Sequence, residues 1–143
     1  CAEGTHAAEG ATTCTPNNPP AIALSGNNTA IPNRANTGSA GNDTDFGSAA
    51  MGVPVTHTFT VENLFGSNPL TLTGVPLVTV AGVHQSDFSV TQPIASSLPG
   101  GTITTFTVTF TPTAAGLRSA LIVLTHNDLP DNPFVFAVQG IGL

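Results

Sequence analysis

The sequence predicts an all-β sandwich of seven to nine strands. Short segments of alternating apolar and polar residues recur along the chain, separated by turns rich in Gly, Pro and Asn. No segment shows the 3.6-residue periodicity of an amphipathic helix. The length of 143 residues suits one domain with a hydrophobic core of its own.

The clearest strand spans 102–112, TITTFTVTFTP. Its apolar residues share one face of the pleat and its threonines share the other, which is the period-2 pattern of a half-buried strand. The inward face would carry Phe106, Val108 and Phe110, and the outward face Thr105, Thr107 and Thr109. Because such a strand must bury its apolar face, a second sheet is expected to pack against it.

The other strand candidates are short apolar or alternating segments that follow in order: Ala21–Ser25, Asp45–Gly47, Val55–Asn63, Leu70–Leu72, Leu77–Val80, Asp87–Thr91, Ala120–Thr125 and Phe134–Val138. The segment TFTV occurs at 58–61 and again at 105–108, and we expect the two to be facing counterparts. Ala120–Thr125 is apolar on both faces, which is typical of a central strand covered on both sides or of one whose outer face meets a neighbour. Gly26–Asp43 has no apolar pattern beyond Ile31 and is predicted to be a long loop.

Charge is scarce in this chain. Only 7% of the residues are charged, the two cations are Arg34 and Arg118, and the formal net charge is -6. Nucleic acid and anionic membranes are excluded as partners because both require clustered cations. No apolar run approaches the roughly 18 residues of a membrane-spanning helix. The abundance of Thr, Ser, Asn and Gly in place of charge indicates an extracellular or cell-surface protein.

Residues 1–20 are predicted to form a separate tail or connector before the sandwich of 21–143. Cys1 and Cys14 bracket a polar segment, and we expect a disulfide between them, worth roughly 3 kcal/mol for a loop of about 15 residues. A lipidated Cys1 and free or intermolecular thiols are the alternatives. Residues 1–16 resemble an ephrin-receptor-like cysteine repeat at Cys1, Gly4, Thr5, Gly10, Ala11, Cys14, Thr15 and Pro16. Asn17 stands where such repeats carry a further Cys, and a disordered tail is the alternative.

No residue pattern in the sequence indicates catalysis, so we expect a protein that is not an enzyme and needs no cofactor. The four histidines form no His-x-x-x-His pair, and no Gly-x-Ser-x-Gly nucleophile motif occurs. Asp128 and Asp131, with neighbouring Asn residues, are a weak candidate site for Ca²⁺, and Asx turns are the alternative. The absence of Trp and Tyr weakens a sugar-binding function.

From Ala21 to Leu143 the chain resembles the choice-of-anchor D and Hydin-like (ASH-type) group of immunoglobulin-like domains. The matching segments are Asp45–Gly47, Thr58–Asn63, Leu70–Gly74, Asp87–Val90, Gly100–Gly101, Phe106–Pro112, Gly116–Arg118, Asn127–Asp128, Asn132–Phe134 and Gly140–Gly142. The resemblance implies an immunoglobulin-like sandwich in large bacterial secreted or surface proteins. It implies no catalytic residues.

Two functions are compatible with these features. Natural β-sheet proteins commonly protect exposed strand edges with Lys and other charged residues. The Thr-rich strands of this chain carry no Lys and few charges. We therefore expect a non-enzymatic extracellular subunit that associates with copies of itself into a filament, sheath or fibre. The outward threonines would form the assembly face, and an extended tail could add to a neighbour's sheet edge. The alternative is an adhesion module of a multidomain surface protein that binds a glycan or a host protein.

Overall fold

The computed structural model describes residues 19–64, 67–128 and 131–143; the predicted bond between Cys1 and Cys14 and the cysteine-repeat resemblance lie outside them. The strands are β1 (Ile22–Gly26), β2 (Thr29–Ile31), β3 (Asp45–Ala49), β4 (Val55–Asn63), β5 (Leu70–Thr71), β6 (Val78–Ala81), β7 (Phe88–Val90), β8 (Ser97–Leu98), β9 (Ile103–Phe110), β10 (Gly116–Leu124) and β11 (Phe134–Gly142). Two short 3-10 helices, η2 (Ala40–Asn42) and η3 (Gln85–Asp87), connect them.

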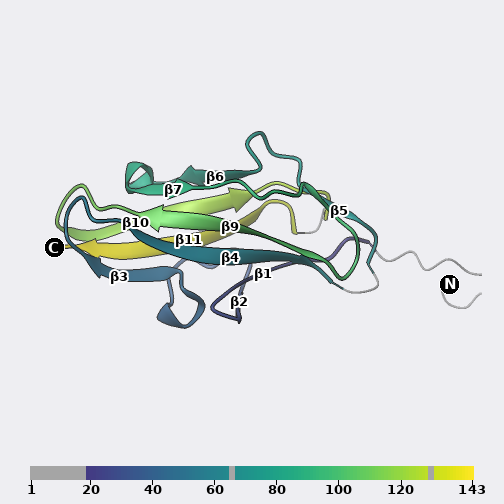
Figure 1. The fold of residues 1–143 in the computed structure, drawn as a ribbon, viewed down its shortest axis with the longest axis horizontal. Coiled ribbons are helices and arrows are strands. Elements are labelled where there is room, and N and C mark those ends of the chain that lie inside the picture. The colour runs from purple at the N-terminus through teal and green to yellow at the C-terminus, as the bar shows by residue number, and fades with distance from the viewer. Residues whose placement is uncertain (1–18, 65–66, 129–130) are drawn as a thin grey trace, which may run out of the picture.

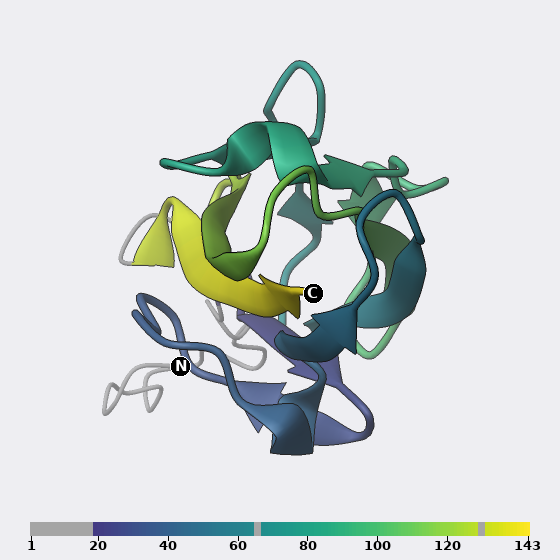
Figure 2. The same ribbon diagram turned by 90° about the vertical axis from the view of Figure 1, so that its left-hand side faces the viewer.

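The strands form two packed layers (Figures 1 and 2). One sheet has the order β2-β1-β4-β9-β7 and the other the order β3-β11-β10-β6, while β5 and β8 pair separately. Neighbouring strands are antiparallel except for the β3–β11 pair. The all-β sandwich predicted from the sequence is confirmed. No helix in the described ranges has the length and apolar character needed to cross a membrane.

Alternating residues of the two sheets meet in one aromatic core. Phe59 lies at its centre, with its ring centroid 5.8 Å from that of Phe106 on the neighbouring strand and 5.6 Å from that of Phe136 in the opposite sheet. Phe46, in the strand predicted at Asp45–Gly47, is buried. The inward face predicted for 102–112 is confirmed because Phe106, Val108 and Phe110 are all buried.

Three predictions differ from the structure. There are eleven strands and not seven to nine, since β2 and β8, which the sequence did not predict, are too short to show a periodic pattern. Gly26–Asp43 is not one loop. Asn27 and Asn28 both adopt left-handed φ angles of 51° and 56° and close a tight hairpin between β1 and β2. The two TFTV segments are antiparallel neighbours in one sheet, with Phe59 paired to Phe106, and do not face each other across the layers.

Candidate functional site

The threonines predicted as an assembly face lie on the outer surface of the five-stranded sheet. Thr105 is exposed, while Thr107 and Thr109 are half-buried. The Oγ1 atoms of Thr109 and Thr56 are 2.8 Å apart, as are those of Thr107 and Thr91. The hydroxyls therefore bind partly to one another within the sheet.

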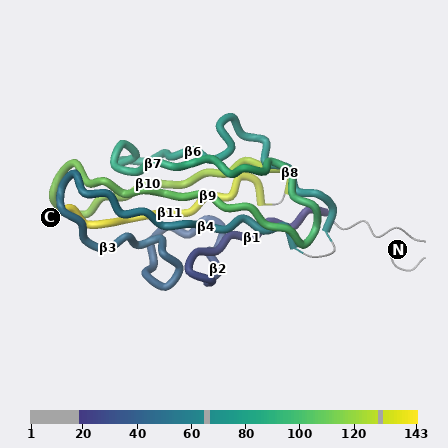
Figure 3. Tube along the Cα trace, viewed as in Figure 1, coloured from purple at the N-terminus to yellow at the C-terminus, as the bar shows by residue number. Residues whose placement is uncertain are grey.

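These threonine strands do not supply sheet edges, because β4 and β9 are interior strands. At the seam between the sheets, where β6 and β7 run side by side (Figure 3), the Gln92 amide accepts a hydrogen bond from Val78 N at 2.8 Å and donates one to Val78 O at 2.9 Å. On the other side, Ala35 forms a parallel bridge to Phe136 beside β3. The outermost strand β2 has only three residues. In the described part of the chain, the sheet edges are therefore short or bridged, and they offer little exposed backbone to which a strand of a neighbouring copy could pair.

The loop predicted as a weak calcium site forms the corner where β1 begins. Asp128 is buried, and its Oδ2 accepts a hydrogen bond from Ile22 N at 3.1 Å. Asn127 Oδ1 accepts one from Thr71 N at 2.9 Å, and Asp131 is exposed. The side-chain oxygens of Asn127 and Asp128 thus bind backbone N–H groups of distant segments and hold this corner together. Across residues 19–64, 67–128 and 131–143, no group of three or more His, Cys, Asp or Glu is placed to hold a metal ion.

His126 is buried in the same corner and held by backbone groups. Its Nδ1 accepts a hydrogen bond from Asp128 N at 3.0 Å, so the ring proton is on Nε2, which donates to Asp131 O at 3.1 Å. Burial disfavours the charged ring and lowers the pKa of His126 below its ordinary 6.5. The hydrogen bond to the Asp131 carbonyl and the carboxylates of Asp128 and Asp131 raise the pKa, but by less than burial lowers it.

Stability is expected to decrease as the pH falls below 6.5, because the unfolded chain takes up a proton that folded His126 resists. One proton gives a slope of at most about 1.4 kcal/mol per pH unit. Chemical denaturation between about pH 7.5 and 5 measures this slope. His126→Asn keeps an acceptor near the Nδ1 position, so the variant should be less stable at neutral pH with a flatter slope. An unchanged slope in the variant would assign the effect to other groups.

A partly buried ion pair joins η3 to β10. Arg118 Nε donates to Asp87 Oδ2 at 2.7 Å, and Thr113 donates from its N and Oγ1 at 3.2 and 2.7 Å. Burial alone raises the pKa of Asp87, but the hydrogen bonds from Arg118 and Thr113 outweigh it and hold the pKa below the ordinary 3.8. It is the single ion pair among the described residues, so one of the chain's two cations is committed to a structural contact.

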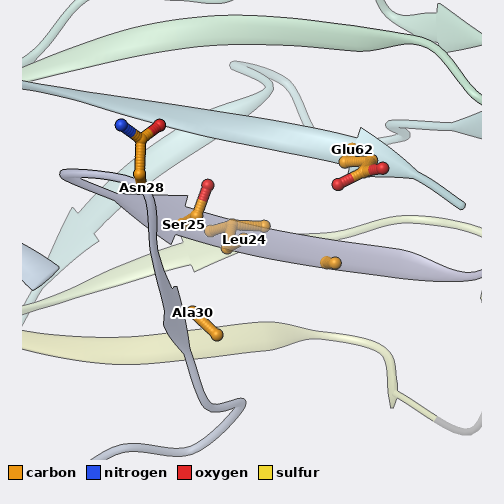
Figure 4. A pocket seen from close by; sticks show the side chains of 6 residues that line it. Leu24, Ser25, Asn28, Ala30 and Glu62 are labelled. Atoms are coloured by element: carbon orange, nitrogen blue, oxygen red, sulfur yellow. The ribbon is translucent and has the colours of Figure 1, made fainter.

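A shallow cavity of about 300 Å³ lies on the outer surface of β1, β2 and β4 (Figure 4). Glu62 is the charged residue of its lining, and Ser25 and Asn28 are the polar ones. The remaining lining residues are Ala or Leu. With one carboxylate and no aromatic ring, the lining does not select a particular class of ligand.

Exposed apolar side chains gather at the end of the sandwich where β11 finishes. We call this surface the C-terminal patch; its members are Met51, Val53, Leu117, Ile141 and Leu143. Leu117 and Ile141 are cross-strand partners on the outer face of the four-stranded sheet. Leu143 N donates to Ala49 O at 3.0 Å, which brings the end of β11 to the loop that carries Met51 and Val53.

The C-terminal patch continues onto the outer face of β10. Leu121 is partly exposed beside a groove of about 240 Å³, which is also lined by Val83 and Ala137. One sequence signal pointed here, because Ala120–Thr125 is apolar on both faces. The rest of the patch was missed, since its residues come from three separate segments.

The sequence matches the family model described as HYDIN/CFA65/VesB-like, Ig-like domain over residues 41–140. No curated protein matches the chain. A solved protein of unknown function from Porphyromonas gingivalis W83 aligns with a TM-score of 0.62 and 15% identity, covering 93% of this chain and 51% of that one. The chain thus spans about half the length of that structure.

Two further solved structures share the fold. The secreted serine protease VesC from Vibrio cholerae aligns with a TM-score of 0.54 and 17% identity over 69% of this chain and 21% of that one. The ASH/PapD-like domain 7 of human CEP192 aligns with a TM-score of 0.53 and 15% identity over 99% and 96%. The resemblance to Hydin-like domains is confirmed: the chain belongs to the HYDIN/CFA65/VesB-like family of immunoglobulin-like domains.

Proposed function

We propose that the protein is a non-enzymatic extracellular structural module that associates with copies of itself into a surface filament, sheath or fibre. The observation that carries this proposal is the C-terminal patch. Large exposed apolar groups gathered on one surface mark interaction sites in soluble proteins. Because all five members of the patch are exposed apolar residues, the patch favours another apolar surface as its partner.

The contacts of the described histidines support a function without catalysis. His57 Nδ1 lies 2.8 Å from Asp43 O, and its ring stacks on Phe46 with centroids 4.3 Å apart. His84 Nδ1 accepts a hydrogen bond from Ser119 N at 3.0 Å. Together with the buried His126, these rings serve as structural hydrogen-bonding groups. The low charge of the chain and the secreted VesC protease among its structural neighbours support an extracellular location.

Self-association is expected to weaken at least about tenfold in Leu117→Asp, since the variant places a charge in the patch and removes about 1.4 kcal/mol or more of contact free energy. Ile103→Asp is a matched control, because Ile103 is 58% exposed on the threonine face and Leu117 is 59% exposed. Sedimentation velocity across a concentration series measures both variants. A wild-type protein that stays monomeric at every concentration refutes the proposal. Disruption by Ile103→Asp alone would instead assign assembly to the Thr105, Thr107 and Thr109 face.

The second candidate is an adhesion or ligand-binding module of a multidomain surface protein. It is favoured by the partial coverage of the solved relatives, since the chain corresponds to 21% of VesC and 51% of the Porphyromonas protein. This function predicts a monomeric domain that is retained on an array of glycans or host proteins. Failure of retention combined with concentration-dependent assembly would reject it.

A further inference from the structure

We propose that the C-terminal patch of one copy receives two apolar loops from the opposite end of a second copy, so that the copies join head to tail. The inference rests on the proposed self-association and names the partner surface. The loops are 72–78 and 92–96. Each presents one fully exposed apolar side chain, Val75 in the first loop and Ile94 in the second.

Val75 and Ile94 are the most exposed large apolar residues of the described chain, at 98% and 100%. Their neighbours are anchored: Pro93 is buried, and Ala95 packs against the hydrophobic core. The alternation directs Ile94 away from the molecule. Leu77 likewise packs against the core two residues after Val75. Ile94 therefore stands between two anchored residues, and Val75 stands two residues before an anchored one.

The two loops are also tied to each other. At one end of the loops, Gln92 Oε1 accepts a hydrogen bond from Val78 N and Gln92 Nε2 donates one to Val78 O. At the other end, Leu72 N donates to Ser96 O at 2.8 Å. Fixed loops lose little conformational freedom on binding, which favours their use as contact residues. Val75 and Ile94 are accordingly carried on two linked loops, and we call their two exposed side chains the apolar projection.

This projection and the C-terminal patch lie toward opposite ends of the sandwich. β5 and β8, which border the two loops, lie at the end where β4 finishes, whereas β11 finishes at the other end (Figures 1 and 3). A contact between unlike surfaces of two copies is heterologous, and it repeats indefinitely when its rotation does not close a ring. A contact between opposite ends therefore gives the linear assembly of the proposed function when the rotation between copies leaves the chain of copies open.

Charge makes a second copy the matching occupant. Neither loop contains a charged residue, and the one charged residue in the segments that carry the patch, Arg118, is paired with Asp87, while the chain as a whole carries a formal net charge of -6. Copies with the same net charge repel one another, so they approach most favourably through surfaces that are neutral on both sides. Both ends of the proposed contact meet that condition.

The test uses two double variants and their mixture. Val75→Asp/Ile94→Asp removes the projection, and Leu117→Asp/Leu143→Asp removes the patch. Each variant alone should associate at least about tenfold more weakly than wild type. An equimolar mixture should form 1:1 dimers and nothing larger. The intact patch of the first variant can bind the intact loops of the second, and the remaining surface of each copy is disrupted. Sedimentation velocity gives the masses, and Ile103→Asp serves as the control that keeps wild-type assembly.

All replaced side chains are exposed, and thermal melts should match that of the wild type; Val75→Ser/Ile94→Ser is a neutral second variant if they do not. Wild-type assembly that persists in both loop variants overturns the head-to-tail contact and leaves the proposed function standing. Monomeric variants whose mixture yields no dimer overturn it as well, because an intact loop pair and an intact patch would then have failed to bind each other. A wild-type chain that never associates removes the proposed function together with this inference.

Discussion

Phe106→Ala is expected to lower the free energy of unfolding by about 3 to 5 kcal/mol, the cost typical of removing a buried Phe from a well-packed core. Phe106 is 1% exposed and pairs across strands with Phe59. Because Phe59 also contacts Phe136 of the opposite sheet, the cavity would open beneath the contact that joins the two layers. A loss of this size is a large fraction of the roughly 5 to 15 kcal/mol that stabilises a typical domain.

Denaturant unfolding of wild type and variant gives the difference from the shift in midpoint at constant slope. Thr105→Ala is the control on the same strand, with its side chain on the outer face of the sheet. It should cost less than about 1 kcal/mol, the span of strand propensities. Similar losses in the two variants would mean that the inward and outward faces of β9 are not energetically distinct.

The periodic residues of this chain predicted most of the sandwich. Alternation over 102–112 and Val55–Asn63 identified the two longest strands of one sheet together with their inward faces. It could not identify their partners, because alternation shows which residues share a face and not which strand lies beside them. β4 pairs with β9, and this pairing depends on how the whole chain connects its strands and not on the pattern within either strand.

Short elements and close approaches lie beyond the same pattern. The Asn27–Asn28 hairpin depends on two left-handed residues, which a search for apolar periodicity does not detect. In the sequence, Gly140 stands out only as part of the Gly140–Gly142 segment shared with Hydin-like domains. In the structure the Phe110 ring occupies the space that a side chain at Gly140 would need, so the glycine is required for packing between the sheets.

The candidate site was less predictable than the fold. Val75 and Ile94 are isolated apolar residues in Gly- and Pro-containing segments, and their exposure depends on how neighbouring residues are anchored. The C-terminal patch joins residues from the β3–β4 loop, β10 and the end of β11. Only the doubly apolar segment Ala120–Thr125 carried a local signal of an outward contact surface.

The second large effect is expected for Asn63→Asp, at about 4 kcal/mol or more, because a carboxylate would be buried opposite two carbonyl groups. Asn63 has no exposed surface, and its Nδ2 donates to Asn68 O at 2.7 Å and to Leu98 O at 2.9 Å. Its Oδ1 accepts from Ala21 N at 3.0 Å. One amide therefore links the start of β1, the segment after β4 and β8.

The aspartate variant keeps the acceptor and loses both donors, which isolates the contribution of the Nδ2 contacts. Asn68→Asp is the control, since it makes the same chemical change in the same corner at an exposed side chain and should stay within about 0.5 kcal/mol of wild type. Protonation restores one donor at position 63, and burial raises the pKa of the new carboxyl. The deficit of Asn63→Asp relative to wild type should therefore shrink as the pH falls toward about 4, a trend opposite to that expected from His126. A deficit independent of pH would indicate that the corner opens to water around position 63, and that the Asn63 amide is not the group that closes it.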